Sequence, residues 1–232
     1  PLFSLSAAGL FALQGSLLQS GPRLRAAAHF IVGKHPNQLM SVIHSFDSTF
    51  VRMQYTLKKS LGQHFLHDEA ICQRIVDSLS SDAEKVLEIG PGGGAITKYL
   101  IEKNFAQYQC VEIDEEKVNY LHKTYPALQG KIIHTDFLHM PLPYEGQFAI
   151  IGNFPYNISS QIVFKVLDWR EQVSEVVGMF QKEVALRIAS KHGSKDYGIL
   201  SVLTQVYYDV TYLFDIPATC FTPPPKVVSG LI

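Results

Sequence analysis

The chain has 232 residues, of which 47% are apolar, and this is enough for one well-buried core. Its formal net charge is −1, so composition gives no argument for a partner of strong opposite charge, such as nucleic acid or an anionic membrane surface. No apolar run approaches the length of a membrane span, so no membrane partner is expected.

Residues 1–52 differ from the rest of the chain. They begin with Pro1, hold no acidic residue before Asp47 and show no sustained hydrophobic period, as is typical of organellar transit segments. The alternative is an upstream in-frame translation or fusion scar, with the true start at Met53. We therefore expect an atypical N-terminal extension outside the fold and one domain over residues 53–232. That domain carries 16 basic and 20 acidic residues, so binding of nucleic acid requires a local patch or a further segment.

Three cysteines, Cys72, Cys110 and Cys220, are widely spaced in apolar surroundings. Their spacing matches neither a metal site nor a disulfide framework, which favours a reducing compartment. We expect them to be small buried hydrophobic residues.

From Met53 onward, helical and strand patterns alternate. The first helix is predicted to begin at Asp68, a possible N-cap, because Ile71, Ile75 and Leu79 follow at a spacing of four. The predicted helices span residues 68–80, 95–103, 115–123, 159–167, 182–190 and 198–206. The predicted strands span residues 85–90, 108–113, 131–134, 148–151, 175–180 and 207–214, and "KVVSGLI" begins another. This alternation predicts an α/β, Rossmann-like fold with a doubly wound, mostly parallel sheet, whose ligands bind beyond the carboxyl ends of the strands.

A glycine-rich turn, "EIGPGGGAITKYL", places Gly90, Gly92 and Gly94 between a buried strand and a helix. Glycines let the backbone turn sharply and leave room for a ligand against the main chain. Glu112 ends the next strand, 18 residues beyond Gly94, where a carboxylate is suited to accept both hydroxyls of a ribose. Together these features predict a cofactor that contains adenosine.

The sequence of this turn is consistent with two kinds of cofactor. Gly90, Gly92 and Ala95 satisfy the G-x-G-x-x-G/A pattern of nicotinamide cofactors. Pro91 removes a backbone donor that a pyrophosphate needs, and Glu88 adds a negative charge just before the turn. Both details favour a cofactor with a cationic centre, S-adenosylmethionine. A purely structural strand–helix turn remains a third interpretation.

Asp136, in "IIHTDFLHM", follows the third predicted strand. At that position its carboxylate could accept a hydrogen bond from the exocyclic amine of the cofactor's adenine. An aspartate in a loop also commonly caps a turn or helix, so both interpretations stay open.

The stretch "GNFPYN" follows a buried apolar run. The side-chain oxygen of Asn153 and the main-chain carbonyl of Phe154, held rigid by Pro155, can accept hydrogen bonds from both hydrogens of an adenine amine. Such bonds pull the nitrogen toward tetrahedral geometry and localise its lone pair for methyl transfer. Tyr156 offers a ring on which the base can stack, worth about 1–3 kcal/mol. A plain turn after a strand is the alternative.

Together with "LGQHFL", "VEID", "TDF" and "FTPPPKV", these motifs make the chain resemble the small-subunit ribosomal RNA adenine N6,N6-dimethyltransferase family from about Lys58 to the C-terminus. The resemblance implies dimethylation of two adjacent adenosines in small-subunit (16S-type) rRNA during ribosome biogenesis, with S-adenosylmethionine as cofactor. It implies that residues 53–232 are the methyltransferase catalytic domain. The family continues past "PPPKV" into another strand and a small helical RNA-binding domain, and we expect the helical domain to be absent from residues 53–232.

The resemblance also implies roles for individual residues. His64 and Leu66 would close over the cofactor, and Asn153 would lie beside the reacting nitrogen. Phe221 would form a second aromatic wall for the target base. The residues that the resemblance assigns to the cofactor pocket are Gln63, His64, Leu66, Gly90, Gly92, Glu112, Asp136 and Asn153.

Partners and alternatives follow from the same resemblance. The expected partner is small-subunit rRNA within a pre-ribosomal particle, bound by a monomer in the cytoplasm, or in the mitochondrial matrix if residues 1–52 are a transit segment. His64 and His67 lack a cysteine or carboxylate to complete a metal set, so no metal is expected. The alternatives are a related enzyme acting on large-subunit RNA, a non-catalytic rRNA-binding assembly or transcription factor of the same fold, and a nicotinamide-dependent dehydrogenase.

Overall fold

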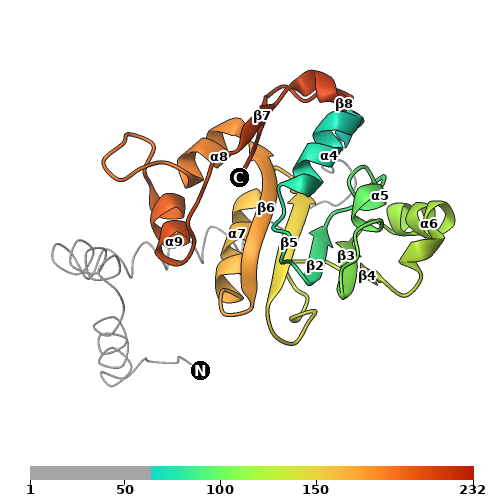
Figure 1. The fold of residues 1–232 in the computed structure, drawn as a ribbon. Helices are drawn as coiled ribbons and strands as arrows, with labels where there is room; N and C mark the ends of the chain where they lie inside the picture. The colour runs from blue at the N-terminus through green and yellow to red at the C-terminus, as the bar shows by residue number, and fades with distance from the viewer. Residues whose placement is uncertain (1–63) are drawn as a thin grey trace, which may run out of the picture. The chain divides into compact units, whose positions relative to one another are not determined.

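The computed structural model describes residues 64–232, so the predictions for residues 1–52 and for Gln63 lie outside it. Its main sheet has the strand order β4-β3-β2-β5-β6-β9-β7 (Figure 1). The strands are β2 (Lys85–Ile89), β3 (Gln107–Glu112), β4 (Ile132–His134), β5 (Phe148–Asn153), β6 (Val173–Gln181), β7 (Phe214–Ile216) and β9 (Ser229–Leu231). The first five in that order pair in parallel, and β9 pairs antiparallel with β6 and β7. The predicted mostly parallel, doubly wound sheet is confirmed.

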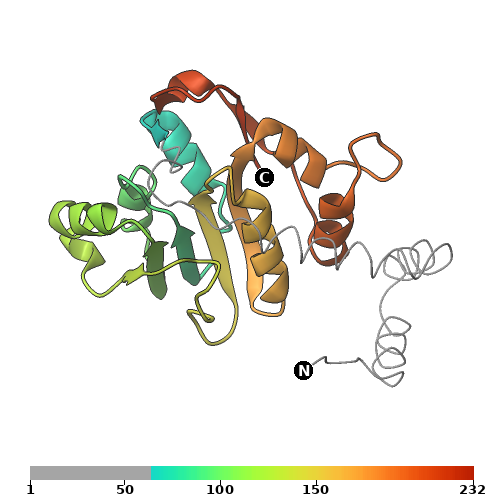
Figure 2. The same cartoon turned by 180° about the vertical axis from the view of Figure 1, so that it is seen from behind.

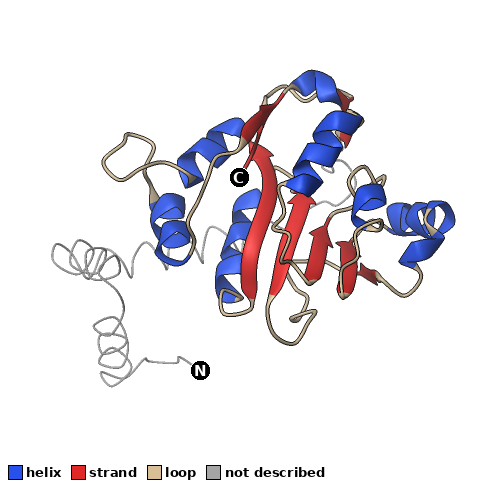
Figure 3. Ribbon diagram, in the orientation of Figure 1, coloured by secondary structure: helices blue, strands red, loops and turns tan. Residues whose placement is uncertain are grey.

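Helices alternate with these strands along the chain (Figure 3). They are α4 (Glu69–Asp77), α5 (Thr97–Leu100), α6 (Glu115–Thr124), α7 (Ser159–Asp168), α8 (Lys182–Ile188) and α9 (Ile199–Tyr207), with short 3-10 turns η1 (Pro126–Leu128) and η2 (Ala218–Cys220). The predicted cap of the first helix is confirmed, because the Asp68 side chain accepts a hydrogen bond from the backbone N–H of Ile71 at 3.0 Å. No helix within residues 64–232 is long and apolar enough to cross a lipid bilayer.

The buried side chains form two clusters, one on each side of the sheet. Successive strand residues point to opposite faces, so Val86 packs in the cluster that includes α4 and α5, and Leu87 packs in the cluster that includes α7. Figure 2 shows the helices and strands of the same fold from behind. All three cysteines are free and buried, as predicted.

Several element boundaries differ from the prediction, and three of the differences have a clear physical cause. The strand predicted over residues 207–214 is wrong: only Phe214 of that range is in a strand, because the partner β9 has three residues and pairs only with Phe214–Ile216. The helix predicted over residues 95–103 is only α5, since the left-handed backbone of Gly94 and an i to i−3 bond from Lys103 N–H to the Leu100 carbonyl confine it. Strand β5 is two residues longer than predicted, because Gly152 pairs with both β2 and β6 and Asn153 pairs with β6.

Candidate active site

Four predicted site positions meet at one edge of the sheet. Gly90 follows β2, Glu112 ends β3, Asn153 ends β5, and Asp136 lies two residues after β4. Since these strands run parallel, their carboxyl ends lie at the same edge, in the order Asp136, Glu112, Gly90, Asn153. The fold therefore brings together residues separated by more than 60 positions in the sequence.

The glycine turn lies at the centre of this edge. Gly90, Gly92 and Gly94 have φ angles of 67°, 56° and 84°, which side-chain-bearing residues rarely adopt. A Cβ on Gly94 would lie 2.4 Å from the Tyr125 ring, so this glycine is required by packing. A Cβ on Gly90 would lie 3.9 Å from the main-chain oxygen of Asn153, which places the turn directly beside the N-F-P-Y segment.

Glu112 lies on the other side of the turn, and its side chain is 8% exposed. One carboxylate oxygen accepts a hydrogen bond from Gly92 N–H at 3.1 Å, and the other accepts from Ile113 N–H at 2.9 Å and Asp114 N–H at 3.0 Å. An ionised carboxylate offers about four lone-pair sites, so these three bonds fix its orientation and leave capacity for a ribose hydroxyl. The open backbone turn and this carboxylate fit the adenosine portion of S-adenosylmethionine.

Asp136 caps a turn, which is one of the two interpretations that its sequence position left open. One carboxylate oxygen accepts a hydrogen bond from Leu138 N–H at 2.9 Å, which is a turn cap, and the other lies 2.6 Å from His139 Nδ1. The side chain remains one-third exposed. The cap is therefore present, and recognition of an adenine amine has to use the remaining lone pairs.

The side chain of Phe154 lies in the core, whereas its main chain lies at the candidate site. Its side chain is 1% exposed and packs edge-on against Phe180, with ring centroids 5.2 Å apart. Two glycines make room for this ring, because a Cβ on Gly152 or Gly178 would lie within 2.9 Å of it. With the ring buried, only the main-chain carbonyl of Phe154 is suited to a role in the chemistry.

Tyr156 is held at both ends. Its hydroxyl shares a hydrogen bond with the Ser229 hydroxyl of β9, and its ring stacks on His64 with centroids 6.5 Å apart. Burial raises the pKa of Tyr156, so the hydroxyl stays protonated at neutral pH. Pro155 precedes it and accepts a bond from Ile158 N–H at 3.1 Å, which continues the chain toward α7. The sequence contained no local signal for the contact with Ser229.

The last two residues of "LGQHFL" and the first two of "FTPPPKV" pair in a second, two-stranded sheet. Strand β1 (Phe65–Leu66) pairs antiparallel with β8 (Phe221–Thr222), so Leu66 lies opposite Phe221. His64 Nδ1 lies 2.7 Å from the Pro223 carbonyl oxygen, which fixes the start of this segment. Both Leu66 and Phe221 are buried, at 6% and 2% exposure. The predicted stacking role of Phe221 needs an exposed ring, and in this structure the ring lies in the core.

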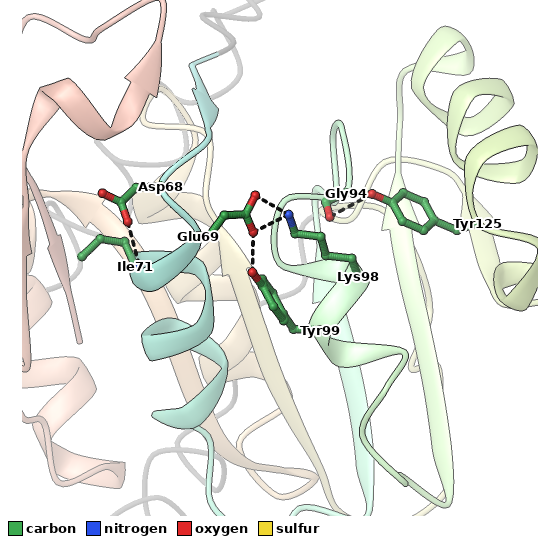
Figure 4. Close-up of polar contacts among 7 residues, drawn as sticks. All are labelled: Asp68, Glu69, Ile71, Gly94, Lys98, Tyr99 and Tyr125. Carbon is green, nitrogen blue, oxygen red and sulfur yellow. Dashed lines mark hydrogen bonds and ion pairs between the residues drawn. The ribbon is translucent and has the colours of Figure 1, made fainter.

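A polar network joins α4 to α5, just after the glycine turn (Figure 4). The Glu69 carboxylate contacts Lys98 Nζ at 2.6 Å and the Tyr99 hydroxyl. Because Lys98 bonds to Glu69, the pKa of Lys98 is raised and that of Glu69 is lowered. Figure 4 also shows Tyr125, whose hydroxyl reaches the Gly94 carbonyl at 3.5 Å. These contacts hold helix α4 against α5 and support the glycine turn.

Glu88 is buried beneath the turn, so its side chain offers a bound cofactor no direct contact of the kind that the sequence suggested. Its side chain is fully buried and accepts hydrogen bonds from the Thr97 hydroxyl at 2.9 Å and from the Tyr108 hydroxyl. Burial raises its pKa from 4.5 to about 7. Glu88 therefore ties β2 to β3 and α5 beneath the turn. Its partners are 9 and 20 residues away, so local sequence gave no sign of them.

The part of the chain that the structure describes contains no cluster of three or more histidine, cysteine, aspartate or glutamate side chains placed to hold a metal ion.

A mostly parallel sheet with a left-handed glycine turn between an acidic strand end and an N-F-P-Y segment defines the class of S-adenosylmethionine-dependent methyltransferases. Within that class, the chain belongs to the ribosomal RNA adenine dimethylase family, whose model matches residues 54–232. S-adenosylmethionine is accordingly its cofactor.

Individual relatives agree with this assignment. The chain is 58% identical to the ribosomal RNA small subunit methyltransferase A of Cytophaga hutchinsonii, over 75% of this chain and 69% of that protein. The corresponding Flavobacterium johnsoniae protein is also 58% identical, over 75% of this chain and 68% of its own length.

Two solved structures are also similar. A dimethyladenosine transferase from Plasmodium falciparum has a TM-score of 0.63 and 28% identity, over 72% of this chain and 62% of that one. The 23S rRNA methyltransferase ErmE has a TM-score of 0.62 and 29% identity, over 72% and 67%. The chain thus spans about two thirds of the length of these relatives.

Proposed function

We propose that residues 53–232 form a catalytic domain that transfers methyl groups from S-adenosylmethionine to the N6 amines of two adjacent adenosines in small-subunit rRNA. The observation that carries this proposal is the contact between the glycine turn and the N-F-P-Y segment, where Gly90 lies 3.9 Å, measured from an added Cβ, from the Asn153 main-chain oxygen. A cofactor seated on the turn then lies next to the acceptors that hold the target amine.

The chemistry of the site follows from two acceptors and no strong base. S-adenosylmethionine supplies an electrophilic methyl group on a sulfonium. Asn153 Oδ1 and the Phe154 carbonyl accept hydrogen bonds from the two amine hydrogens, which localises the nitrogen lone pair. The buried ring of Phe154 and the adjacent Pro155 keep that carbonyl in place. Holding the amine close to the methyl group provides the rest of the rate enhancement through proximity.

The target base stacks on Tyr156 in this proposal. The bond to Ser229 and the stacked His64 ring hold the tyrosine in one orientation, which lowers the entropy cost of binding a base taken out of its helix. Phe221 serves as the second wall only if β8 moves to expose its ring. Such a movement separates Phe221 from Leu66, its partner in β1.

The cofactor pocket is completed by the other residues of the strand edge. Glu112 accepts a hydrogen bond from the ribose, Asp136 from the adenine amine, and Gly90 and Gly92 give the backbone room to approach the cofactor. Gln63, His64 and Leu66 form the covering segment. The pairing of β1 with β8 supports this role for Leu66, because it fixes the position of that residue.

For the cellular setting, we propose a monomer that acts on a pre-ribosomal small subunit in the cytoplasm. The test is transfer of a labelled methyl group from S-adenosylmethionine to small ribosomal subunits that lack the modification, followed by mass spectrometry of the RNA. We expect two adjacent dimethyladenosines in the small-subunit RNA. Binding of the subunit without transfer would instead identify a non-catalytic assembly factor, and labelling of large-subunit RNA would move the substrate to the other subunit.

A further inference from the structure

A second cleft lies at the amino ends of the strands, opposite the proposed active site. Its volume is about 500 Å³. The side chains that matter for its chemistry are Lys85, Lys103, Gln109, Lys131 and Glu145. Lys85 begins β2 and Lys131 precedes β4, so the cleft opens where parallel strands begin. Strand β2 has five residues, so its two ends are about 13 Å apart at a rise of about 3.3 Å per residue.

The cleft is basic within an acidic domain. Residues 64–232 contain 14 lysines and arginines against 20 aspartates and glutamates, whereas the cleft lining contains three lysines and one glutamate. Lys85 Nζ donates to the main-chain carbonyl of Glu145 at 2.6 Å, which leaves the ammonium charge uncompensated by that contact. Lys103 pairs with Asp77 at 3.0 Å. Across the described residues, the Lys131 side chain has no hydrogen bond or ion pair, so its ammonium is available to an anion.

Gln109 adds a polar acceptor to this basic cleft. Its Oε1 atom is buried and has no hydrogen-bond partner within residues 64–232. A buried acceptor without a donor is costly, and a ligand that supplies a hydroxyl removes the cost. Lysines beside an amide acceptor match the RNA backbone, which offers phosphate oxygens to the ammonium groups and a 2′-hydroxyl to the amide.

We propose that this cleft binds the sugar–phosphate backbone of the substrate RNA, with Lys85 and Lys131 on phosphates and Gln109 on a 2′-hydroxyl. The inference rests on the proposed function, because it takes rRNA as the substrate. RNA bound here contacts the domain at the end of the sheet remote from the methyl-transfer site. The cleft thus supplies the local basic patch that the acidic composition otherwise lacks.

The test compares the full chain with two double variants of equal charge change. In Lys85→Ala/Lys131→Ala the cleft loses both ammonium groups, whereas Lys191→Ala/Lys195→Ala removes two exposed lysines from the loop between α8 and α9. Affinity is measured for a fluorescently labelled hairpin with the sequence of the small-subunit RNA 3′ end, at several salt concentrations. For the cleft variant we expect about a 10-fold or greater loss near 0.1 M salt, and a log–log salt slope smaller by about 1.5. The control variant keeps at least half of the wild-type affinity.

Gln109→Leu tests the ribose contact separately. We expect it to lower the ratio of affinities for the RNA hairpin and a DNA hairpin of the same sequence, while Lys131→Ala alone lowers both affinities together. Equal losses in the two double variants, or no loss in the cleft variant, would overturn the phosphate contacts, and an unchanged ratio would overturn the role of Gln109. Wild-type protein that fails to bind or methylate the RNA would count against the proposed function itself, which separates the two failures.

Discussion

The two ends of the parallel sheet carry opposite charge, although the same strands build both. At the carboxyl ends, Glu112 and Asp136 lie near the glycine turn with no lysine or arginine among their described hydrogen-bond partners. At the amino ends, Lys85, Lys103 and Lys131 line a cleft with one glutamate. The first end suits a cofactor with cationic groups, and the second suits a polyanion.

A buried network links these two ends. Tyr108 lines the basic cleft, and its hydroxyl donates to Glu88, which also bonds to Thr97 beneath the glycine turn. Charge in this fold is therefore segregated along the strands, between their amino and carboxyl ends. A chain with net negative charge can in this way present a basic surface to RNA.

The largest expected effect comes from removing the amide at the carboxyl end. Asn153→Ala should lower the methyl-transfer rate about 100- to 1,000-fold, since a group that acts on the transition state is lost, while the cofactor dissociation constant changes less than about two-fold because Asn153 acts on the target amine. Single-turnover methyl transfer and isothermal titration measure the two quantities. Asn119→Ala, an exposed position on α6, is the matched control. Equal rates in wild type and Asn153→Ala would remove Asn153 from the chemistry.

The buried Glu88 lies between the two ends of the sheet, and its contribution to stability can be tested by changing the pH. Its pKa is raised from 4.5 to about 7, so the fold favours the protonated carboxyl; its contribution to stability is complete below pH 4.5 and is lost as pH rises through 7. The free energy of unfolding of Glu88→Gln minus that of wild type should therefore rise by about 3 kcal/mol between pH 4 and pH 8. Urea unfolding across this range measures it. Glu84→Gln, which is exposed, should show almost no such change, and a flat difference for Glu88→Gln would contradict the buried network.

Glu112 tests the cofactor side of the same edge. Glu112→Ala should weaken cofactor binding by about 1.5–3 kcal/mol, or about 10- to 150-fold, because a charged hydrogen bond to the ribose is lost and the Gly92 N–H loses its acceptor. Equilibrium titration with S-adenosylhomocysteine gives the dissociation constant. Glu115→Ala, an exposed acidic residue three positions later, serves as control. If both variants bind as wild type does, the ribose assignment fails.

The smallest effects are expected at Tyr156, where two variants distinguish the role of the hydroxyl from that of the ring. Tyr156→Phe loses the bond to the buried Ser229 hydroxyl and should cost about 0.5–1.5 kcal/mol of stability, while the stacking face remains. Tyr156→Ala should in addition weaken binding of the target base by about 1–3 kcal/mol. Thermal unfolding and the KM for an RNA substrate distinguish these losses. A KM for Tyr156→Ala equal to that of Tyr156→Phe would rule out the stacking role.

Much of the fold could be predicted, because its elements have local causes. Apolar runs that end in glycine became parallel strands, and the Asp68 cap followed from a side chain beside its own helix. The strand predicted over residues 207–214 failed because strand length there depends on the three residues of β9. A partner distant in the sequence sets that boundary.

The candidate site could likewise be predicted only in part. The placement of Glu112, Gly90 and Asn153 at one edge of the sheet followed from the alternation of strands and helices, whereas their order along that edge depends on the strand order. The burial of Glu88, the burial of the Phe221 ring and the Ser229 contact depend on side chains from other elements, so no local pattern predicted them.

The most direct test of the central claim is a crystal structure of the chain with S-adenosylhomocysteine and adenosine. We expect the adenosine N6 nitrogen to lie about 2.7–3.2 Å from both Asn153 Oδ1 and the Phe154 carbonyl oxygen, on the side that faces the cofactor sulfur. An adenosine held in the pocket with N6 bonded to other groups, and the Asn153 amide turned away from it, would contradict the account.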